Sequence, residues 1–218
     1  MDKVVIYGAG RHAELTAYEM KRNNLHEVVA FTVRNKYLNK TELNGLPIVS
    51  YEDISRIYPP SEFKMFIAIG PQQINRAREE IFRDAKEKGY QFVNCIWPIP
   101  DFPEDLIIGE NVYIGQDCAI SNFVEIDDNV TLITSKIGHH CKIKANSFIS
   151  ASILAGNVQV EKNVFIGLGS IIGPNITLGE YTVVGMGCTI SKSTAPASVY
   201  LNKSTEKQSF NSSKLKLL

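Results

Sequence analysis

An aliphatic residue recurs at almost every sixth position from residue 108 to residue 190. These anchor positions are Ile108, Ile114, Ile120, Ile126, Leu132, Ile137, Ile143, Ile149, Leu154, Val160, Ile166, Ile172, Leu178, Val184 and Ile190. A period of six matches neither the period of an α-helix, about 3.6 residues, nor the simple alternation of a strand. It is typical of short strands joined by tight corners, three to a coil, in a parallel β-solenoid. Inward side chains there stack at roughly 4.8 Å.

Small residues follow the anchors in a regular way. Glycine often comes directly after an anchor, as at Gly109 and Gly138, and permits a corner that a branched residue resists. The position four residues after an anchor is small or branched, and it holds three of the four cysteines: Cys118, Cys141 and Cys188. No two cysteines have CxxC spacing. We therefore expect packed free thiols, Cys95 included, rather than a metal site or disulfides.

The bulk composition excludes several classes of protein. The 218 residues include 23 Lys and Arg and 23 Asp and Glu, so no net field draws the chain to nucleic acid or an acidic membrane. No apolar run reaches about 18 residues, and the segment MDKVVIYGAG lacks the pattern of a secretory signal. We therefore expect a cytoplasmic protein that binds neither nucleic acid nor membrane.

The first hundred residues alternate strands with helices. Apolar and amphipathic runs predict strands at 3–7, 27–33, 65–69 and 90–96, helices at 12–21 and 73–88, and a short helix at 51–58. Residues 34–50 are predicted to be a polar loop. This alternation indicates a small parallel sheet with helices on its faces, half of a dinucleotide-binding fold.

The segment WPIPDFP at 97–103 interrupts both patterns. The sequence thus predicts an α/β half-Rossmann-like domain over 1–97 and an all-β domain over 104–201. Residues 202–218 carry neither pattern and are predicted to form a loose tail.

The segment GAGRHA at 8–13 follows the first predicted strand and opens the first helix. Backbone N–H groups at such a helix start suit a phosphate, and the spacing matches the dinucleotide fingerprint G-x-G-x-x-A. That fingerprint also requires an acid at the end of the second strand, where this chain has Val33-Arg34. We therefore favour a nucleotide diphosphate over NAD(P), and the alternative is a turn that serves only packing.

Arg11, His12, Gly70 and Arg76 belong to the same carboxyl edge of the predicted sheet. Ligands of open α/β sheets bind at that edge. The alternative is that His12 and Arg76 are ordinary solvated residues of helix surfaces.

His139 and His140 directly follow an anchor and its glycine, Ile137-Gly138, and are predicted to lie at a corner or an outward position. A neutral imidazole can accept a proton from an attacking amine, which is worth roughly 10²–10⁴ in rate. The alternative is a pair of surface histidines without a role. Because adjacent strand residues point to opposite faces, we do not expect the pair to share a zinc ion.

Taken together, these motifs resemble the sugar acyltransferases of the PglD/NeuD type over residues 1 to about 200. The resemblance rests on GAGRHA, IAIG with Arg76, KIGHHC at 136–141, LAGNV at 154–158 and the hexapeptide array. It implies a left-handed parallel β-helix and a homotrimer with active sites between neighbouring subunits. It also implies acetyl-CoA as donor and a nucleotide-linked amino sugar as acceptor.

The resemblance implies roles for single residues. His139 matches the catalytic base, with His140 beside it, and the backbone N–H of Gly156 matches the group that faces the thioester carbonyl. The residues expected to contact acetyl-CoA are Ala155, Gly156, Gly167, Leu168, Gly185 and Met186. The residues expected to contact the acceptor are Gly8, Gly10, Arg11, His12, Arg34, Gly70 and Arg76.

Several features depart from the family pattern. The acid that usually follows and orients the base is His140, and the acidic pair usual after the second strand is Val33-Arg34. The usual G-x-P-A near the C-terminus is replaced by residues 201–204 (LNKS), and two shortened steps, Leu132 to Ile137 and Ile149 to Leu154, flank His139 in the sequence. We interpret these departures as changes of acceptor or acyl group, with the nucleobase (UDP, dTDP or GDP) left open.

The predicted function is N-acetylation of a nucleotide-linked 4-amino-4,6-dideoxy sugar for a surface glycan. One alternative is O-acetylation of a sugar of the sialic acid type, but a hydroxyl needs a better-oriented base than an amine does. Another is a non-catalytic trimeric scaffold that binds nucleotide sugar. The missing G-x-P-A favours the scaffold, and His139 followed by LAGNV opposes it.

Overall fold

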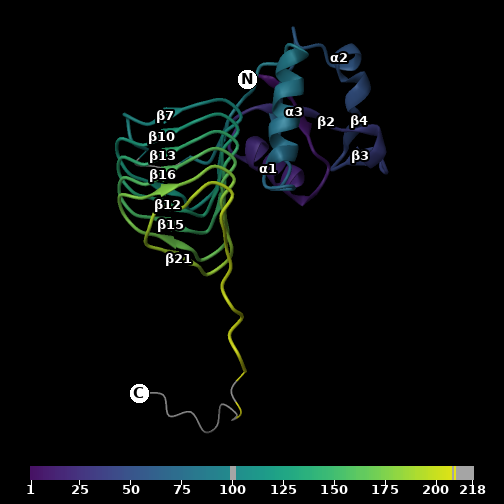
Figure 1. The fold of residues 1–218 in the computed structure, drawn as a ribbon. Coiled ribbons are helices and arrows are strands. Elements are labelled where there is room, and N and C mark those ends of the chain that lie inside the picture. Colours follow the sequence, from purple (N-terminus) through teal and green to yellow (C-terminus); the bar gives the residue numbers. More distant parts are fainter. Residues whose placement is uncertain (99–101, 208, 210–218) are drawn as a thin grey trace.

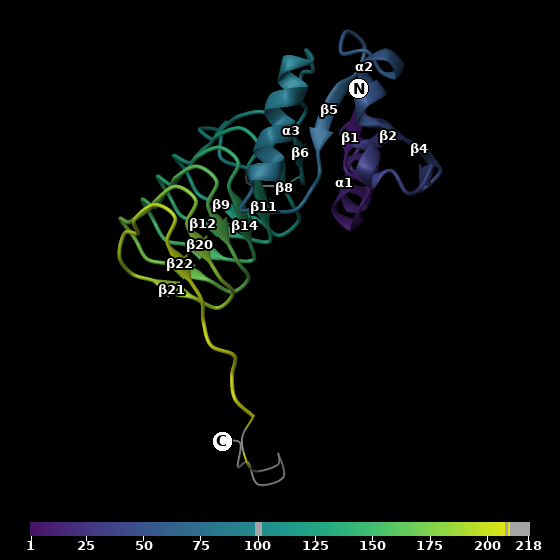
Figure 2. The same cartoon turned by 45° about the vertical axis from the view of Figure 1, so that its right-hand side comes forward.

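The computed structural model describes residues 1–98, 102–207 and 209. Residues 99–101 of the predicted junction and most of the predicted tail lie outside the described residues. An α/β domain lies beside the first coils of a stack of short strands (Figure 1). The chain leaves the far end of this stack (Figure 2), and residues 203–207 are exposed.

The α/β domain is built on a five-stranded sheet in the order β3-β4-β2-β1-β5. Its elements are β1 (Lys3–Tyr7), α1 (Arg11–Arg22), β2 (Glu27–Val33), a 3-10 turn (Asn35–Tyr37), β3 (Glu42–Leu43), β4 (Leu46–Ser50), a second 3-10 turn (Tyr51–Asp53), α2 (Ile54–Ile57), β5 (Lys64–Ile67) and α3 (Arg76–Glu87). All strands are parallel except β3, which is antiparallel to β4. Alternation along β1 forms two layers, because Val4 and Ile6 pack with α1 while Val5 and Tyr7 pack with α2 and α3.

The structure corrects three predicted elements. Residues 34–50 are more than a loop, because β4 pairs with β2 and buries Ile48. The strand predicted at 90–96 is reduced to Cys95–Ile96 (β6), which pairs with β8 (Tyr113–Ile114) in the solenoid. The second long helix begins at Arg76 rather than at residue 73, because residues 73–75 all have positive φ and turn the chain with the opposite hand.

The solenoid is a parallel β-helix of three sheets that the chain visits in turn. The sheet that we call the charged face contains β7 (Ile107–Ile108), β10 (Glu125–Ile126), β13 (Lys142–Ile143), β16 (Gln159–Val160) and β19 (Thr177–Leu178). The covered face contains β6, β8 (Tyr113–Ile114), β11 (Thr131–Ile133), β14 (Phe148–Ser150), β17 (Phe165–Ile166), β20 (Val183–Val184) and β22 (Val199–Tyr200). The apolar face contains β9 (Ala119–Ile120), β12 (Lys136–Ile137), β15 (Ile153–Leu154), β18 (Ile171–Ile172) and β21 (Thr189–Ile190).

The six-residue period is confirmed by the core. Every anchor belongs to or packs against one buried cluster, and only Ile108 and Ile120 of the first coil are partly exposed. The four cysteines are buried and free, as predicted. Both shortened steps, at Thr134 and Ala151, form the corner between the covered face and the apolar face, so they do not form the corner that carries His139.

The outward residues give the three faces their different surfaces. The α/β domain packs against the covered face, where Tyr113 and Phe148 are buried. The charged face carries the ion pair Lys142–Glu125, whose atoms are 2.8 Å apart. On the apolar face, Ile153 and Ile171 are each 47% exposed. No described element covers these two side chains, although each belongs to a rigid coil.

Four asparagines with positive φ stack at the corner between the charged face and the covered face: Asn111, Asn129, Asn146 and Asn163. Each side-chain amide donates to the carbonyl of the next asparagine, at 2.7 to 3.1 Å. At one end Asn111 Oδ1 accepts from Ile67 N at 2.7 Å, and at the other Asn163 Nδ2 donates to Glu79 Oε2 at 2.8 Å. This asparagine ladder ties β5 and α3 to four successive coils.

Arg78 of α3 is enclosed at the same junction, with 1% of its surface exposed. Its Nη2 donates to Asn129 O at 2.7 Å and to Thr131 Oγ1 at 2.8 Å. Burial lowers the pKa of Arg78 to about 9, and no described carboxylate pairs with it. Carbonyl and hydroxyl oxygens of the β-helix therefore replace water around this guanidinium.

Candidate active site

His139 lies at the corner between the apolar face and the charged face, directly after β12 and Gly138. Its side chain is exposed, in agreement with the sequence. Main-chain hydrogen bonds to the next coil fix the corner, since Gly138 N donates to Leu154 O at 2.9 Å and Asn157 N donates to His139 O at 2.8 Å. The fold thus holds the backbone under the ring and leaves the ring accessible.

The ring of His139 lies over Gly156, which follows β15 in the next coil. A β-carbon on Gly156 would come within 2.6 Å of both Cε1 and Nε2 of that ring. Only glycine therefore leaves the imidazole in this position. Stacking of successive coils brings together the two residues that the sequence singled out for acyl transfer, together with Ala155.

The two adjacent imidazoles contact each other. His139 Nδ1 and His140 Nδ1 are 3.0 Å apart, with the ring planes at 89°. The expectation that the two rings point to opposite faces was wrong, because strand alternation does not extend into the corner, where His140 has a φ of +59°. The ring of His140 packs against Phe123 of the preceding coil, with ring centroids 4.6 Å apart.

No metal centre accompanies this pair in the part of the chain that the structure describes. No group of three or more His, Cys, Asp or Glu side chains there has the arrangement of metal ligands. Two imidazoles are fewer than the three protein ligands of a catalytic zinc site.

A second predicted group occupies a different corner, between the covered face and the apolar face. Gly167, Leu168, Gly185 and Met186 follow β17 and β20 at this corner. Leu168 and Met186 are 52% and 70% exposed, so they form an apolar strip along the axis. Such a strip suits the aliphatic and amide groups of a pantetheine arm. One chain therefore presents its predicted acetyl-CoA contacts on two corners.

A cavity of about 570 Å³ opens at the carboxyl edge of the α/β sheet. Gly8 and Arg34 line it, as do Tyr7 and Glu80. Gly8 has a φ of +130°, and a β-carbon there would lie 2.6 Å from Ala68 O, so this turn requires glycine. Arg34 Nη2 donates to Glu80 Oε1 at 2.6 Å. Burial raises the pKa of Tyr7 to about 12, so its hydroxyl is neutral.

The other predicted acceptor contacts lie near this cavity without lining it. Gly10 caps α1, Arg11 is exposed, and Gly70 lies beside the lining residue Gln72. The guanidinium of Arg76 lies 4.2 Å from the centroid of the Tyr181 ring in the β-helix.

His12 packs at the domain junction, with its ring centroid 5.1 Å from that of Tyr113 and 6.5 Å from that of Phe148. Burial, aided by the charge of Arg78, lowers the pKa of His12 to about 4. His12 is therefore neutral at pH 7, where it can offer hydrogen bonds but no ion pair.

The sequence reasoning missed Glu80 and Arg78. Glu80 follows Arg76 by four residues on α3, and this spacing alone places the two on one helix face. Arg78 lies between charged neighbours in RAREE, which reads as a solvated helix surface. Nothing in the local pattern signals its burial.

The cavity and His139 lie on different sides of the molecule. Each corner of a three-sided coil is opposite the remaining face, so the corner carrying His139 is opposite the covered face. The α/β domain packs on that covered face through Asn75, which precedes α3, through Arg78 of α3, and through His12 and Glu19 of α1. A molecule held in the cavity of one chain therefore does not reach the imidazole of the same chain.

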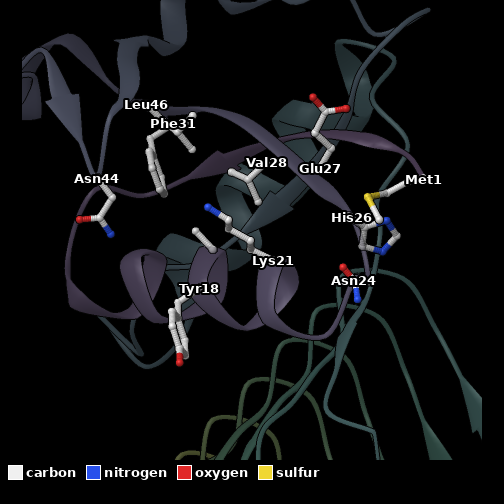
Figure 3. A pocket seen from close by; sticks show the side chains of 11 residues that line it. Met1, Tyr18, Lys21, Asn24, His26, Glu27, Val28, Phe31, Asn44 and Leu46 are labelled. Atoms are coloured by element: carbon white, nitrogen blue, oxygen red, sulfur yellow. The ribbon is translucent and has the colours of Figure 1, made fainter.

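A further cavity of about 440 Å³ lies between α1, β2 and the β3–β4 hairpin (Figure 3). Tyr18, Lys21, His26 and Leu46 are among its lining residues. It contains none of the predicted site residues and lies away from both corners described above.

None of the described helices has the length and hydropathy that crossing a bilayer requires.

Two families match the chain in succession. The PglD N-terminal domain matches residues 3–85, and the bacterial transferase hexapeptide (six repeats) matches residues 157–192.

Solved structures resemble the chain over nearly its whole length. The structure of a mutant of perosamine N-acetyltransferase from Caulobacter crescentus, in complex with CoA and GDP-perosamine, is 26% identical. It has a TM-score of 0.82 over 91% of this chain and 93% of that one. The acetyltransferase domain of PglB from Neisseria gonorrhoeae is 21% identical, with a TM-score of 0.81 over 91% and 96% of the two chains. These likenesses confirm the predicted fold, an α/β domain followed by a left-handed parallel β-helix.

Curated relatives match over part of the chain. The galactoside O-acetyltransferase of Escherichia coli is 32% identical over 103 residues, which cover 40% of this chain and 48% of that protein. The chain spans between 27% and 65% of the lengths of the curated relatives that it matches.

Proposed function

Because this chain belongs to the PglD/NeuD-type sugar acyltransferases, we propose that it transfers an acetyl group from acetyl-CoA to the amine of a nucleotide-linked amino sugar. The observation that carries the proposal is the placement of His139 over Gly156 at an exposed corner. The α/β domain supplies a separate cavity of suitable chemistry for a nucleotide. The acceptor proposed in detail is a 4-amino-4,6-dideoxy sugar destined for a surface glycan.

The chemistry assigned to each residue follows from its position. His139 Nε2 takes a proton from the amine as nitrogen attacks the thioester carbonyl, and the backbone N–H of Gly156 donates to the developing oxyanion. Leu168 and Met186 hold the pantetheine arm through apolar contacts. Gly8 and the start of α1 offer main-chain N–H groups to the diphosphate, while Arg34 and Glu80 border the space for the base.

The separation of the cavity from His139 supports a site shared between copies of the chain. The apolar face, with Ile153 and Ile171, and the adjoining strip of Leu168 and Met186 form an exposed apolar surface of rigid coils. Such a surface on a soluble chain favours contact with another protein surface. We assign it to two further copies in a trimer, in which His139 of one copy faces the strip and the cavity of its neighbour.

The setting proposed for this reaction is the cytoplasm. All four cysteines are free, as expected in a reducing compartment.

The proposal is tested by incubating the purified chain with acetyl-CoA and UDP-, dTDP- or GDP-linked amino sugars. Release of the free CoA thiol and mass spectrometry of the sugar measure the transfer. We expect His139→Ala to lower turnover about 10²-fold or more. Binding of the nucleotide sugar, measured by calorimetry, should stay nearly unchanged, because the cavity that holds the nucleotide is lined by residues of the α/β domain and not by His139.

Two outcomes would replace this proposal. Acetylation of hydroxy sugars without acetylation of amino sugars would assign O-acetyl transfer, the activity in the name of the Escherichia coli relative. Absence of any heat of binding with millimolar CoA would assign a scaffold that binds nucleotide sugar only.

A further inference from the structure

We propose that His140 is a positioning and relay residue, which accepts the Nδ1 proton of His139 and passes a proton on to solvent. The inference rests on the proposed function. It concerns how the catalytic base is oriented and how it loses a proton after accepting one from the amine. The observation that carries it is the direct contact between the two Nδ1 atoms at 3.0 Å.

The contact permits only two arrangements of protons while both rings are neutral. One Nδ1 must carry a hydrogen and the other a lone pair. If His140 donated, His139 would carry its own hydrogen on Nε2, and that nitrogen could not take a proton from an amine. A working base at Nε2, the ring nitrogen on the side of Gly156, therefore requires that His139 donates from Nδ1 and His140 accepts.

The surroundings of His140 hold it in the accepting position. Its φ of +59° turns the side chain back toward His139, and the ring of Phe123 packs against it at 4.6 Å. The backbone N–H of His140 donates to Asn122 O at 3.1 Å. The ring is exposed to solvent, so its Nε2–H has water as a proton acceptor.

No nearby charge competes for either ring among the residues that the structure describes. Asp105, on the side of the preceding coil, accepts from Asn122 Nδ2 at 3.3 Å and from Phe123 N at 2.8 Å. On the following strand, Lys142 pairs with Glu125. No carboxylate hydrogen-bonds to His139 or His140 within the described residues, so the second imidazole takes the place that a carboxylate would fill.

The relay is balanced in protons. The amine nitrogen gives one proton to His139 Nε2, and the Nδ1 proton of His139 moves to Nδ1 of His140. His140 then releases its Nε2 proton to water, and both rings are neutral again in the opposite tautomers. The C–S bond breaks as the amide forms, and the CoA thiolate that leaves takes a proton from water. Rotation of the rings, or proton exchange with water in the reverse direction, restores the starting tautomers of both imidazoles. A carboxylate in this place would hold the imidazolium and would have no second proton to release.

The decisive variant is His140→Asn. Asparagine occupies the same corner in the next two coils, as Asn157 and Asn175, each with a φ of +59°, so this substitution suits the backbone. Its amide oxygen can still accept from His139 Nδ1, but the amide cannot relay a proton. We expect turnover to fall about tenfold or more and to recover as imidazole is added to the buffer, while the unaltered protein does not respond. Full turnover without added imidazole would overturn the relay.

Imidazole ¹⁵N spectra test the pairing without any substrate. We expect His139 to carry its hydrogen on Nδ1 and His140 on Nε2 in the neutral protein, and His140→Ala to abolish this preference at His139. The reversed polarity, or no preference in the unaltered protein, would overturn the inference. An unaltered protein that acetylates no acceptor would overturn the proposed function instead, and the spectra would still decide the pairing.

Discussion

Replacing Gly156 by alanine should lower the rate of catalysis and leave the stability of the fold nearly unchanged. The new β-carbon would lie 2.6 Å from Cε1 and Nε2 of His139, whereas ordinary contact begins at 3.4 Å. The ring must therefore retreat by about 0.8 Å, the difference between these distances. A displacement near 1 Å at a reacting group costs on the order of 10² in rate, so we expect kcat to fall about 10²-fold.

The fold should tolerate this change, because the atoms that must move belong to an exposed side chain. The backbone of Gly156 lies outside the positive-φ region, so alanine is not strained there. Thermal unfolding should shift by no more than about 2 °C, as for a surface substitution of less than 0.5 kcal/mol.

Gly173→Ala is the matched control, one coil further along the same corner. Its β-carbon would meet only Ile190 O at 3.3 Å and the Cα of Ser191 at 3.5 Å, with no imidazole nearby. Release of the CoA thiol measures both variants. Undiminished turnover of Gly156→Ala, or an equal loss in Gly173→Ala, would refute the stated role of the glycine.

Three other predictions concern the junction and the surface. Stability should be greatest above pH 6.5 and decline as the pH falls from 6.5 to 4. In that window His12 of the unfolded chain binds a proton, whereas His12 of the folded chain, with its pKa lowered to about 4, stays neutral. His12→Leu should therefore reduce the fall in the free energy of unfolding with falling pH, as measured by urea titrations. Arg78→Ala should destabilise the chain by about 1–3 kcal/mol, because it leaves the carbonyl of Asn129 without its buried donor; calorimetry measures this loss, and a change below about 1 kcal/mol would contradict it. Ile171→Lys should shift the sedimentation profile toward single chains, whereas Gln159→Lys on the charged face should not.

The core of the β-helix was predictable because its signal is local. Each inward position, from Ile114 to Ile190, is set by its distance to the previous corner, and coils repeat that rule without long-range information. The same six-residue spacing predicted that His139 lies at an exposed corner. Free buried cysteines such as Cys141 followed as well, because their positions are inward.

Contacts between distant segments were not predictable in this way. The burial of Arg78 depends on carbonyls in two successive coils, and the burial of His12 on rings of the covered face. Strand β4 was missed because Pro47 and the preceding polar residues hide a short buried run.

The contact between His139 and His140 did have a signal in the sequence. Asn157 and Asn175 occupy the position equivalent to His140 in the next two coils. Asparagine is among the residues other than glycine that most readily adopt positive φ. The left-handed turn at His140 could have been inferred from them.

The asparagine ladder fixes the position of the α/β domain along the axis of the β-helix. Hydrogen bonds from Ile67 through four coils to Glu79 fix the height of the α/β domain, with its cavity at Gly8 and Arg34, along the helix axis. The height of the imidazole above that cavity can therefore change only in steps of one coil, each about 4.8 Å. Insertion or deletion of one coil between them would therefore lengthen or shorten the axial distance between the cavity and the imidazole by one such step.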